Sequence, residues 1–338
     1  MTEQRKNYFD YLRVLACCTV VMTHVFVTAK TDFPNHSLIE DNISQIVAWC
    51  LHFAVPIFFM ITGALFLKKK DEINIKIYFK KYILKYLLAI FTFGWGFAII
   101  EEIFNKNFSA IMPLTALINT IEGNTWNHMW YLYTLVGIMA FIPIVKIIVE
   151  KNAKWLKYIL LLLFISSFIF PLISTYTGKN IGIEIPIKSE YLTYVILGYF
   201  LSEKRDNISK LKLACVMVLC FIILGISVYL YQIRGISYFQ SIGDYNSLVI
   251  MLLSISIFLI FKSINFKSNK LILDISCNSY GIYLIHMFWI NFIYKFLEYN
   301  IYGNLIILKT LVVFISVLIL SLISTKMIKK FPLINKII

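Results

Sequence analysis

The sequence predicts an all-α fold: a polytopic integral membrane bundle of about ten transmembrane helices, with both termini cytoplasmic. Of its 338 residues, 59% are hydrophobic and 15% are charged, whereas a soluble domain is nearer half apolar and a quarter charged. The apolar residues gather in runs of about 20, the length with which a helix crosses the hydrocarbon of a bilayer. We therefore expect a single transmembrane domain over residues 1–338 in the cell membrane, with no extramembrane domain.

The apolar runs define the expected helices in order. The first run carries Arg13, is too long for a signal peptide and lacks a cleavage site, so we expect it to be retained. The run before residue 202 is the shortest of the set. The expected spans are 8–29, 45–67, 82–104, 129–149, 156–175, 189–202, 212–232, 246–263, 278–297 and 304–325.

The loops between these runs alternate in charge. One set, which includes both termini and the stretch 68–85, is rich in lysine and arginine. The other set holds few basic residues and carries acids such as Asp32, Glu40 and Glu101. The positive-inside rule then places both termini in the cytoplasm. The net charge of +14 thus indicates topology and attraction to anionic membrane lipid, not binding to nucleic acid.

Three ionisable residues lie inside or at the edge of the first run: Asp10, Arg13 and His24. Arg13 and His24 are eleven positions apart, which puts their side chains on one face of a helix, about 16 Å apart along its axis. Asp10 is three residues from Arg13, close enough to neutralise it. Ionisable residues inside a membrane are costly, and they are functional candidates for that reason. The alternative is that Arg13 reaches the membrane surface and His24 is a packing residue.

Four segments, taken in sequence order, resemble membrane acyltransferase family 3. The first helix has the family's Arg, ten intervening residues and His, although Val14 stands where the family usually has Gly. The others are the stretch 55–65, with Thr62 in place of the usual Ser, the opening of the fourth span at 128–132, and the stretch 279–286 of the ninth. The resemblance covers the whole order of spans.

The resemblance implies an integral-membrane O-acyltransferase that uses acyl-CoA as a co-substrate, with no tightly bound cofactor and no metal. Acetyl is favoured over succinyl, and the acceptor is a surface glycan or glycolipid outside the cytoplasm. We assign the catalytic role to His24, Arg13 and Asp10. Histidine suits base catalysis near neutral pH, and Arg13 can bind a phosphate or polarise the thioester. General-base and acyl-histidine mechanisms both remain open, and a separate extracytoplasmic partner enzyme is compatible with this scheme.

Further residues are assigned to binding. Lysines can bind phosphate as point charges, although a basic stretch after a span is also an ordinary topogenic signal. Aromatic residues near the outer surface can belong to an interfacial belt or can bind a sugar. The residues expected to bind CoA are Arg13, Lys69, Lys70, Lys80 and Lys81. Those expected to bind the acceptor are His128, Trp130, Tyr131, Tyr283 and His286.

Two other classes of function are compatible with buried charges in a helical bundle. A transporter or flippase for a lipid-linked saccharide would also line a cavity with ionisable groups. A membrane sensor or structural protein would bind neither CoA nor a transported solute. Transfer of a labelled acyl group discriminates the enzyme from both.

Overall fold

The computed structural model describes residues 6–68, 74–203 and 208–338, and within these ranges every regular element is a helix. Among the described residues, nine helical stretches are long and apolar enough to cross a membrane. They are α1 (Asn7–Asp32), α2–α3 (Leu38–Leu51 and Ala54–Phe66), α4–α6 with the π-helical turns η1 and η2 (Ile75–Phe104), η3–α8 (Asn127–Lys151), α9–α10 with η4 (Ala153–Thr177), α12 (Lys210–Arg234), η5–α13 (Tyr238–Lys262), α14–η6 (Lys270–Phe296) and α15 (Ile306–Ile328). Three shorter helices are α7 (Met112–Glu122), α11 (Glu190–Glu203) and α16 (Pro332–Asn335). The all-α polytopic fold is therefore confirmed.

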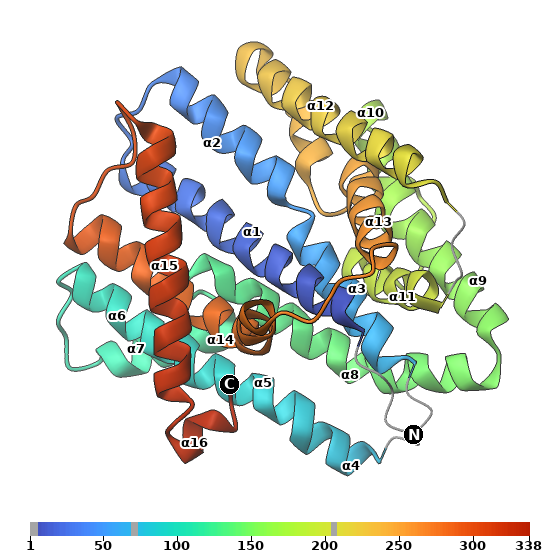
Figure 1. Cartoon of the computed structure of the whole chain (residues 1–338), viewed down its shortest axis with the longest axis horizontal. Coiled ribbons are helices and arrows are strands. Elements are labelled where there is room, and N and C mark those ends of the chain that lie inside the picture. The colour runs from blue at the N-terminus through green and yellow to red at the C-terminus, as the bar shows by residue number, and fades with distance from the viewer. Residues whose placement is uncertain (1–5, 69–73, 204–207) are drawn as a thin grey trace.

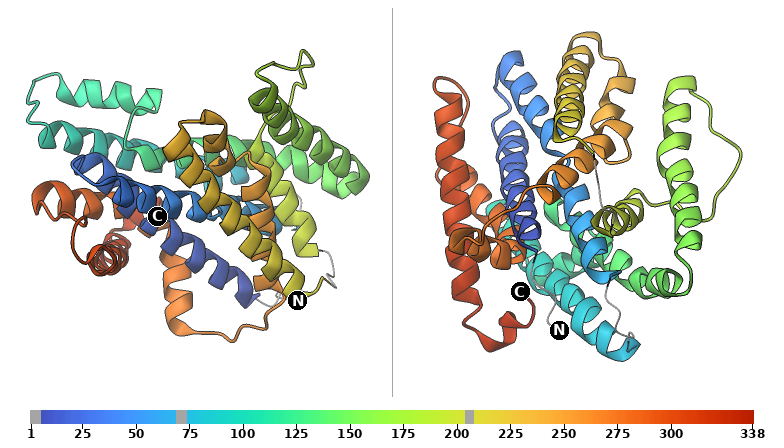
Figure 2. Two further views of the ribbon diagram at one scale, coloured as in Figure 1. Left: turned by 90° about the horizontal axis from the view of Figure 1, so that it is seen from above. Right: turned by 45° about the vertical axis from the view of Figure 1, so that its right-hand side comes forward.

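Helix α1 lies in the middle of the bundle (Figure 1). It packs against α14 on one side and against α2 and α3 on the other. Helix α15 forms one edge and the α9–α10 stretch the opposite edge (Figure 2). This central position explains why Leu12, Ala16 and Val25 of α1 are fully buried, and it places the other face of α1 against the interior cavity described below.

The second span bends between α2 and α3. Pro56 has no backbone N–H to donate to the carbonyl of His52, one turn earlier, so the helix breaks there. The bend at residues 52–53 turns the side chain of His52 toward the interior, where its Nδ1 lies 2.7 Å from the carbonyl oxygen of Gly243.

Helix α11 corresponds to the sixth expected span, but it has 14 residues and covers only about 21 Å. The segment before it is not helical. Its backbone is satisfied by two serines of the π-helical turn η4: Ser166 Oγ donates to the carbonyl of Ile187 at 2.8 Å, and the N–H of Ser189 donates to Ser167 Oγ at 2.9 Å. Irregular backbone is tolerated at such depth where protein groups complete its hydrogen bonds.

Helix α11 is buried because it packs backbone to backbone against α3. A Cβ atom on Gly63 would lie 1.7 Å from the carbonyl oxygen of Val195, and one on Gly198 would lie 2.0 Å from that of Met60. Small residues permit this approach between helices. The sequence therefore predicted both the position and the shortness of the sixth helix, whereas its close approach to α3 depends on glycines in the two helices.

Contacts between loops divide them between two ends of the bundle. At one end, Asn7 Nδ2 donates to the carbonyl of Phe266, and Lys68 pairs with Glu203. At the other, Ser44 is 3.0 Å from the hydroxyl of Tyr302. Each contact joins two segments of the same predicted charge set. We call the first the Arg13 end and the second the Asp32 end, after the residues of α1 nearest to them.

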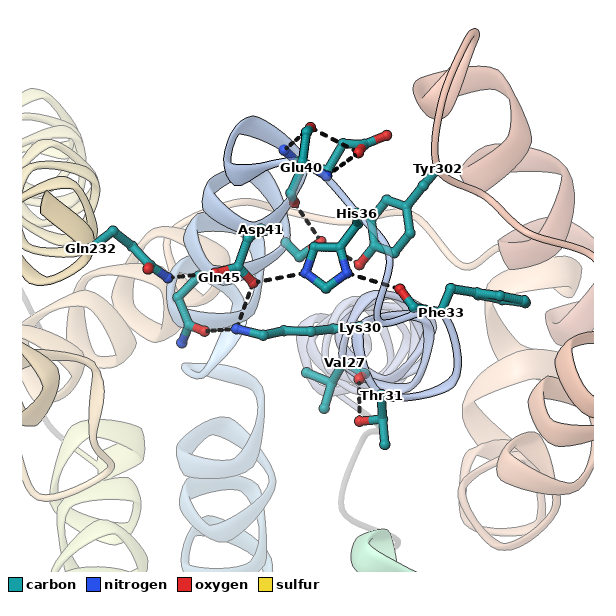
Figure 3. A network of polar contacts seen from close by, with 12 residues as sticks. Val27, Lys30, Thr31, Phe33, His36, Glu40, Asp41, Gln45, Gln232 and Tyr302 are labelled. Carbon is teal, nitrogen blue, oxygen red and sulfur yellow. Dashed lines mark hydrogen bonds and ion pairs between the residues drawn. The ribbon is translucent and has the colours of Figure 1, made fainter.

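A polar network holds the turn between α1 and α2 (Figure 3). Asp41 Oδ1 lies 2.6 Å from Lys30 Nζ and 3.4 Å from His36 Nε2, and Gln232 Nε2 donates to Asp41 Oδ2 at 2.9 Å. His36 Nδ1 lies 2.8 Å from the carbonyl oxygen of Phe33. We call Lys30, His36, Asp41 and Gln232 the Asp41 network. It ties the Asp32 end of α1 to α2 and α12.

Candidate active site

A cavity of about 780 Å³ runs through the bundle beside α1. Arg13, Val20, His24, Val27 and Thr31 all line it, and their spacing of three, four or seven residues is that of one helical face. Arg13 and His24, predicted to share a stripe, therefore open into the same space. The helix rise separates the ends of this stripe by roughly 27 Å, so the cavity extends over most of the length of α1.

The Arg13 end of the cavity contains two cationic side chains, Arg13 and Lys85. Asp10 Oδ1 lies 3.5 Å from Arg13 Nη1 and accepts a hydrogen bond of 2.7 Å from Ser276 Oγ. The pairing expected from the spacing of Asp10 and Arg13 is therefore present. Because Asp10 is buried and does not line the cavity, we regard it as a residue that positions Arg13.

The lysines expected to bind CoA differ in position. Lys80 and Lys81 are exposed on η1 and are not among the residues that line the cavity. Lys69 and Lys70 lie outside the described residues, so their role stays a prediction, as does that of Lys80 and Lys81. Lys85, one turn further on, does line the cavity. Its Nζ donates to the carbonyl oxygen of Ile338 at 3.0 Å and lies 5.1 Å from the ring centre of Tyr280.

Three histidines from three different helices meet at the middle of the cavity. The ring centre of His24 lies 5.2 Å from that of His286 and 6.3 Å from that of His128, and the last two are 5.1 Å apart. His128 stands in η3 and His286 in α14. Their sequence separations exceed one hundred residues, so only the packing of α1, α8 and α14 produces this histidine cluster.

Several ring nitrogens in the histidine cluster lack a partner among the described residues. His286 Nδ1 lies 2.6 Å from the carbonyl oxygen of Tyr283, which makes this nitrogen the donor, while its Nε2 is buried and unpartnered. Neither ring nitrogen of His128 has a hydrogen-bond partner among the residues that the structure describes. A buried polar group left unsatisfied costs about 1–3 kcal/mol. Such a cost is explicable where a ligand completes the hydrogen bonds.

The residues expected to bind the acceptor include two members of the histidine cluster, His128 and His286, and three aromatic residues close to it. The hydroxyl of Tyr283 donates to the carbonyl oxygen of His128 at 2.6 Å, which fixes η3 against α14. Trp130, Tyr131 and Tyr283 line the cavity together with His128. His286 lies behind them, fully buried, and is not among the lining residues. Four of the five predicted residues therefore reach the cavity directly.

The Asp32 end of the cavity is lined by Trp126, one of the aromatic residues that the sequence placed near the outer surface in a belt or a sugar site, and by three charged residues that the sequence did not assign to a site: Asp32, Glu101 and Lys295. They come from α1, α6, the segment before η3, and η6. Each charged member stands near the end of an apolar run, where charges are ordinary. The sequence therefore contains a signal for each residue but none for their convergence. Lys85 was missed for the same reason.

The fold and the cavity define a class: a helical membrane protein with an interior passage that has a histidine cluster at its centre and cations at one end. The model of the acyltransferase domain of acyltransferase family 3 matches residues 6–326. The chain therefore belongs to acyltransferase family 3, and it is a membrane acyltransferase. No curated protein and no solved structure matches it.

Proposed function

We propose that the protein transfers an acyl group, acetyl in the first instance, from cytoplasmic acyl-CoA to a hydroxyl of a surface glycan or glycolipid across the cell membrane. The single observation that carries this proposal is that one cavity contains Arg13, His24 and Asp32. Arg13 and Asp32 lie on opposite sides of His24 along α1, so the proposal assigns the donor to one end of the cavity and the acceptor to the other.

The Arg13 end suits the donor. Arg13 and Lys85 supply two positive charges for the phosphates of CoA. From Arg13 the lining of α1 continues through Val20 and Thr23 to His24, a mixed apolar and hydroxyl surface along which the pantetheine arm can lie. With the phosphates at Arg13, the thioester falls beside His24, about 16 Å further along the helix. The positive-inside rule puts this end in the cytoplasm, where acyl-CoA is present.

The histidine cluster suits the transfer. In the general-base route, His24 removes the proton of the acceptor hydroxyl while that oxygen attacks the thioester carbonyl. The tetrahedral intermediate then collapses, the C–S bond breaks, and the CoA thiolate takes the proton from the imidazolium. In the acyl-histidine route, a ring nitrogen of His24 attacks the thioester carbonyl, the C–S bond breaks, and CoA leaves as a thiol after taking the imidazole proton. The acceptor hydroxyl then attacks the acyl carbonyl, the C–N bond breaks, and the hydroxyl proton returns to the imidazole. Both routes balance, and both need His24 in the cavity.

The test uses purified protein with [14C]acetyl-CoA and a membrane extract that contains the surface glycans. Label recovered on a glycan supports the general-base or acyl-histidine enzyme, and label held on the protein in the absence of acceptor selects the acyl-histidine route. Label that stays on CoA, together with movement of a lipid-linked saccharide across a vesicle membrane, would identify a flippase and overturn the proposal. Mass analysis of glycans from cells with and without the protein then identifies the acceptor.

A further inference from the structure

The Asp32 end of the cavity is built differently from the Arg13 end. Glu101 accepts hydrogen bonds there from two side chains: Trp126 Nε1 donates to its Oε2 at 2.8 Å, and Lys295 Nζ donates to its Oε1 at 3.1 Å and to its Oε2 at 3.4 Å. Glu101 and Lys295 therefore neutralise one another. The indole of Trp126 is fixed by this bond and by stacking on Phe97, with ring centres 4.4 Å apart and planes 12° apart.

Asp32 carries the one negative charge at this end that the Glu101–Lys295 pair does not neutralise. It lines the cavity close to Glu101 and Lys295. Its Oδ2 is buried and has no hydrogen-bond partner within the part of the chain that the structure describes. A carboxylate oxygen can accept more than one hydrogen bond, and leaving it empty in a buried place is costly. The free Oδ2 thus marks a position at which a ligand with hydroxyl or amide donors would be stabilised.

The two ends of the cavity therefore differ in the sign of their charge. Arg13, Lys85 and the Asp10 that pairs with Arg13 give one end a formal charge of +1, while Asp32, Glu101 and Lys295 give the other a formal charge of −1. An anionic group at the Asp32 end would meet an unpaired carboxylate in a poorly solvated place, and like charges at such a place are repulsive. A neutral ligand with several hydroxyls meets an acceptor, Asp32, and an aromatic surface, Trp126.

We propose that Asp32, Glu101, Lys295 and Trp126 form a binding subsite for the uncharged, hydroxyl-rich part of a saccharide, and that this subsite discriminates against saccharides carrying carboxylates. We call it the Asp32 subsite. Naming its ligand the acyl acceptor rests on the proposed function, whereas saccharide binding at the Asp32 subsite does not. The free Oδ2 of Asp32 accepts hydroxyl protons, and the Glu101–Lys295 pair holds Trp126 against one side of the ligand.

The experiment compares two saccharides of equal length and linkage, a galactose oligomer and a galacturonate oligomer, which differ only in the oxidation of C6. Equilibrium binding is measured with the full chain in detergent and without acyl donor. We expect the neutral oligomer to bind at least about tenfold more tightly, because Asp32 repels the carboxylates of the galacturonate oligomer. A tenfold ratio of affinities corresponds to a difference of 1.4 kcal/mol in binding free energy. Asp32→Asn removes the repulsion and should bring the two affinities within about threefold of one another. The binding free energies of the two oligomers would then differ by less than about 1 kcal/mol.

Glu102→Gln is the matched control. Glu102 is the neighbour of Glu101 on α6 and is not among the residues that line the cavity, so this variant should keep the full preference for the neutral oligomer. Trp126→Phe, which keeps an aromatic ring but loses the donor to Glu101, is a second variant that should weaken binding of both oligomers alike.

The wild-type comparison alone can overturn the proposal. Equal affinities, tighter binding of the galacturonate oligomer, or no binding of either would each do so, whether or not a variant folds. A preference that Asp32→Asn leaves intact, or that Glu102→Gln abolishes equally, would also contradict it. Acetyl transfer is assayed separately. Selective binding without transfer would refute the proposed function but support the Asp32 subsite. Transfer without selective binding would support the proposed function but refute the Asp32 subsite.

Discussion

The Asp41 network and the histidine cluster both contain histidine, yet their side chains are satisfied in opposite ways. In the Asp41 network both ring nitrogens of His36 have partners, at 2.8 and 3.4 Å, and the imidazole lies over the ring of Tyr302 with centres 4.9 Å apart (Figure 3). In the histidine cluster, neither nitrogen of His128 and only one nitrogen of His286 has a hydrogen-bond partner within the described part of the chain. The protein completes the first set of hydrogen bonds itself, and at His128, which lines the cavity, it leaves ring nitrogens that a ligand can reach.

This difference separates residues that hold the fold from residues that act on a substrate. A polar side chain whose partners are all protein groups contributes mainly to stability. A polar side chain beside a cavity that lacks a partner lowers the stability of the fold, and a ligand that supplies the missing hydrogen bond gains that free energy on binding. Variants of the two regions should therefore change different quantities, and the predictions below test whether they do.

The largest expected effect is that of His24→Ala. Loss of a positioned base lowers turnover by about 10²–10⁴-fold, and we expect acetyl transfer to fall in this range while thermal unfolding in detergent stays close to that of the wild type. His36→Ala is the matched control, because it removes an imidazole from the Asp41 network and should leave turnover per folded molecule unchanged. Equal activity of the two variants would remove His24 from the mechanism.

The next effect concerns Arg13. A hydrogen bond to a charged group contributes about 1.5–3 kcal/mol, so Arg13→Gln should raise the KM for acetyl-CoA by about 10–100-fold. Arg13→Lys should recover part of the loss, since the charge remains but the paired donors do not. Lys212→Gln, an exposed charge on α12, is the control. If Arg13→Gln shows the same KM as the wild type and Lys212→Gln, Arg13 has no part in donor binding.

A smaller effect is expected for His286→Gln. The amide of Gln can still donate to the carbonyl oxygen of Tyr283, but the variant has no imidazole nitrogen beside His24. Because His286 does not line the cavity, it acts through its neighbours, and we expect kcat to fall by about tenfold, or 1.4 kcal/mol, with KM unchanged. A change confined to unfolding temperature, with normal kcat, would assign His286 to packing alone.

The smallest effect on activity is expected in the Asp41 network. Asp41→Asn removes the charge that pairs with Lys30 and weakens the contacts with His36 and Gln232. Partly buried interactions of this kind contribute about 1–2 kcal/mol to stability. Thermal unfolding should reveal that loss, while kcat and KM per folded molecule remain those of the wild type. A fall in kcat at unchanged stability would mean that the comparison between the two regions is wrong.

The sequence by itself determined the helical membrane fold and the stripe on α1. Apolar runs of about 20 residues require helices in a bilayer, and the spacing of Asp10, Arg13 and His24 follows from helical geometry alone. The kink at Pro56 is likewise local, because a missing N–H acts on its own helix. Motif order also sufficed to recognise the family before the match over residues 6–326.

Tertiary structure decided what depends on residues far apart in the chain. The irregular segment before α11 depends on Ser166 and Ser167, and the burial of α11 depends on the glycine contacts with α3. The approach of His128 and His286 to His24 requires three helices to pack together, and so does the Asp32 subsite. Periodicity reports which face of one helix is apolar, but it carries no information on which faces of different helices meet. Only the packed bundle turns a stripe on α1 into a cavity with two unlike ends.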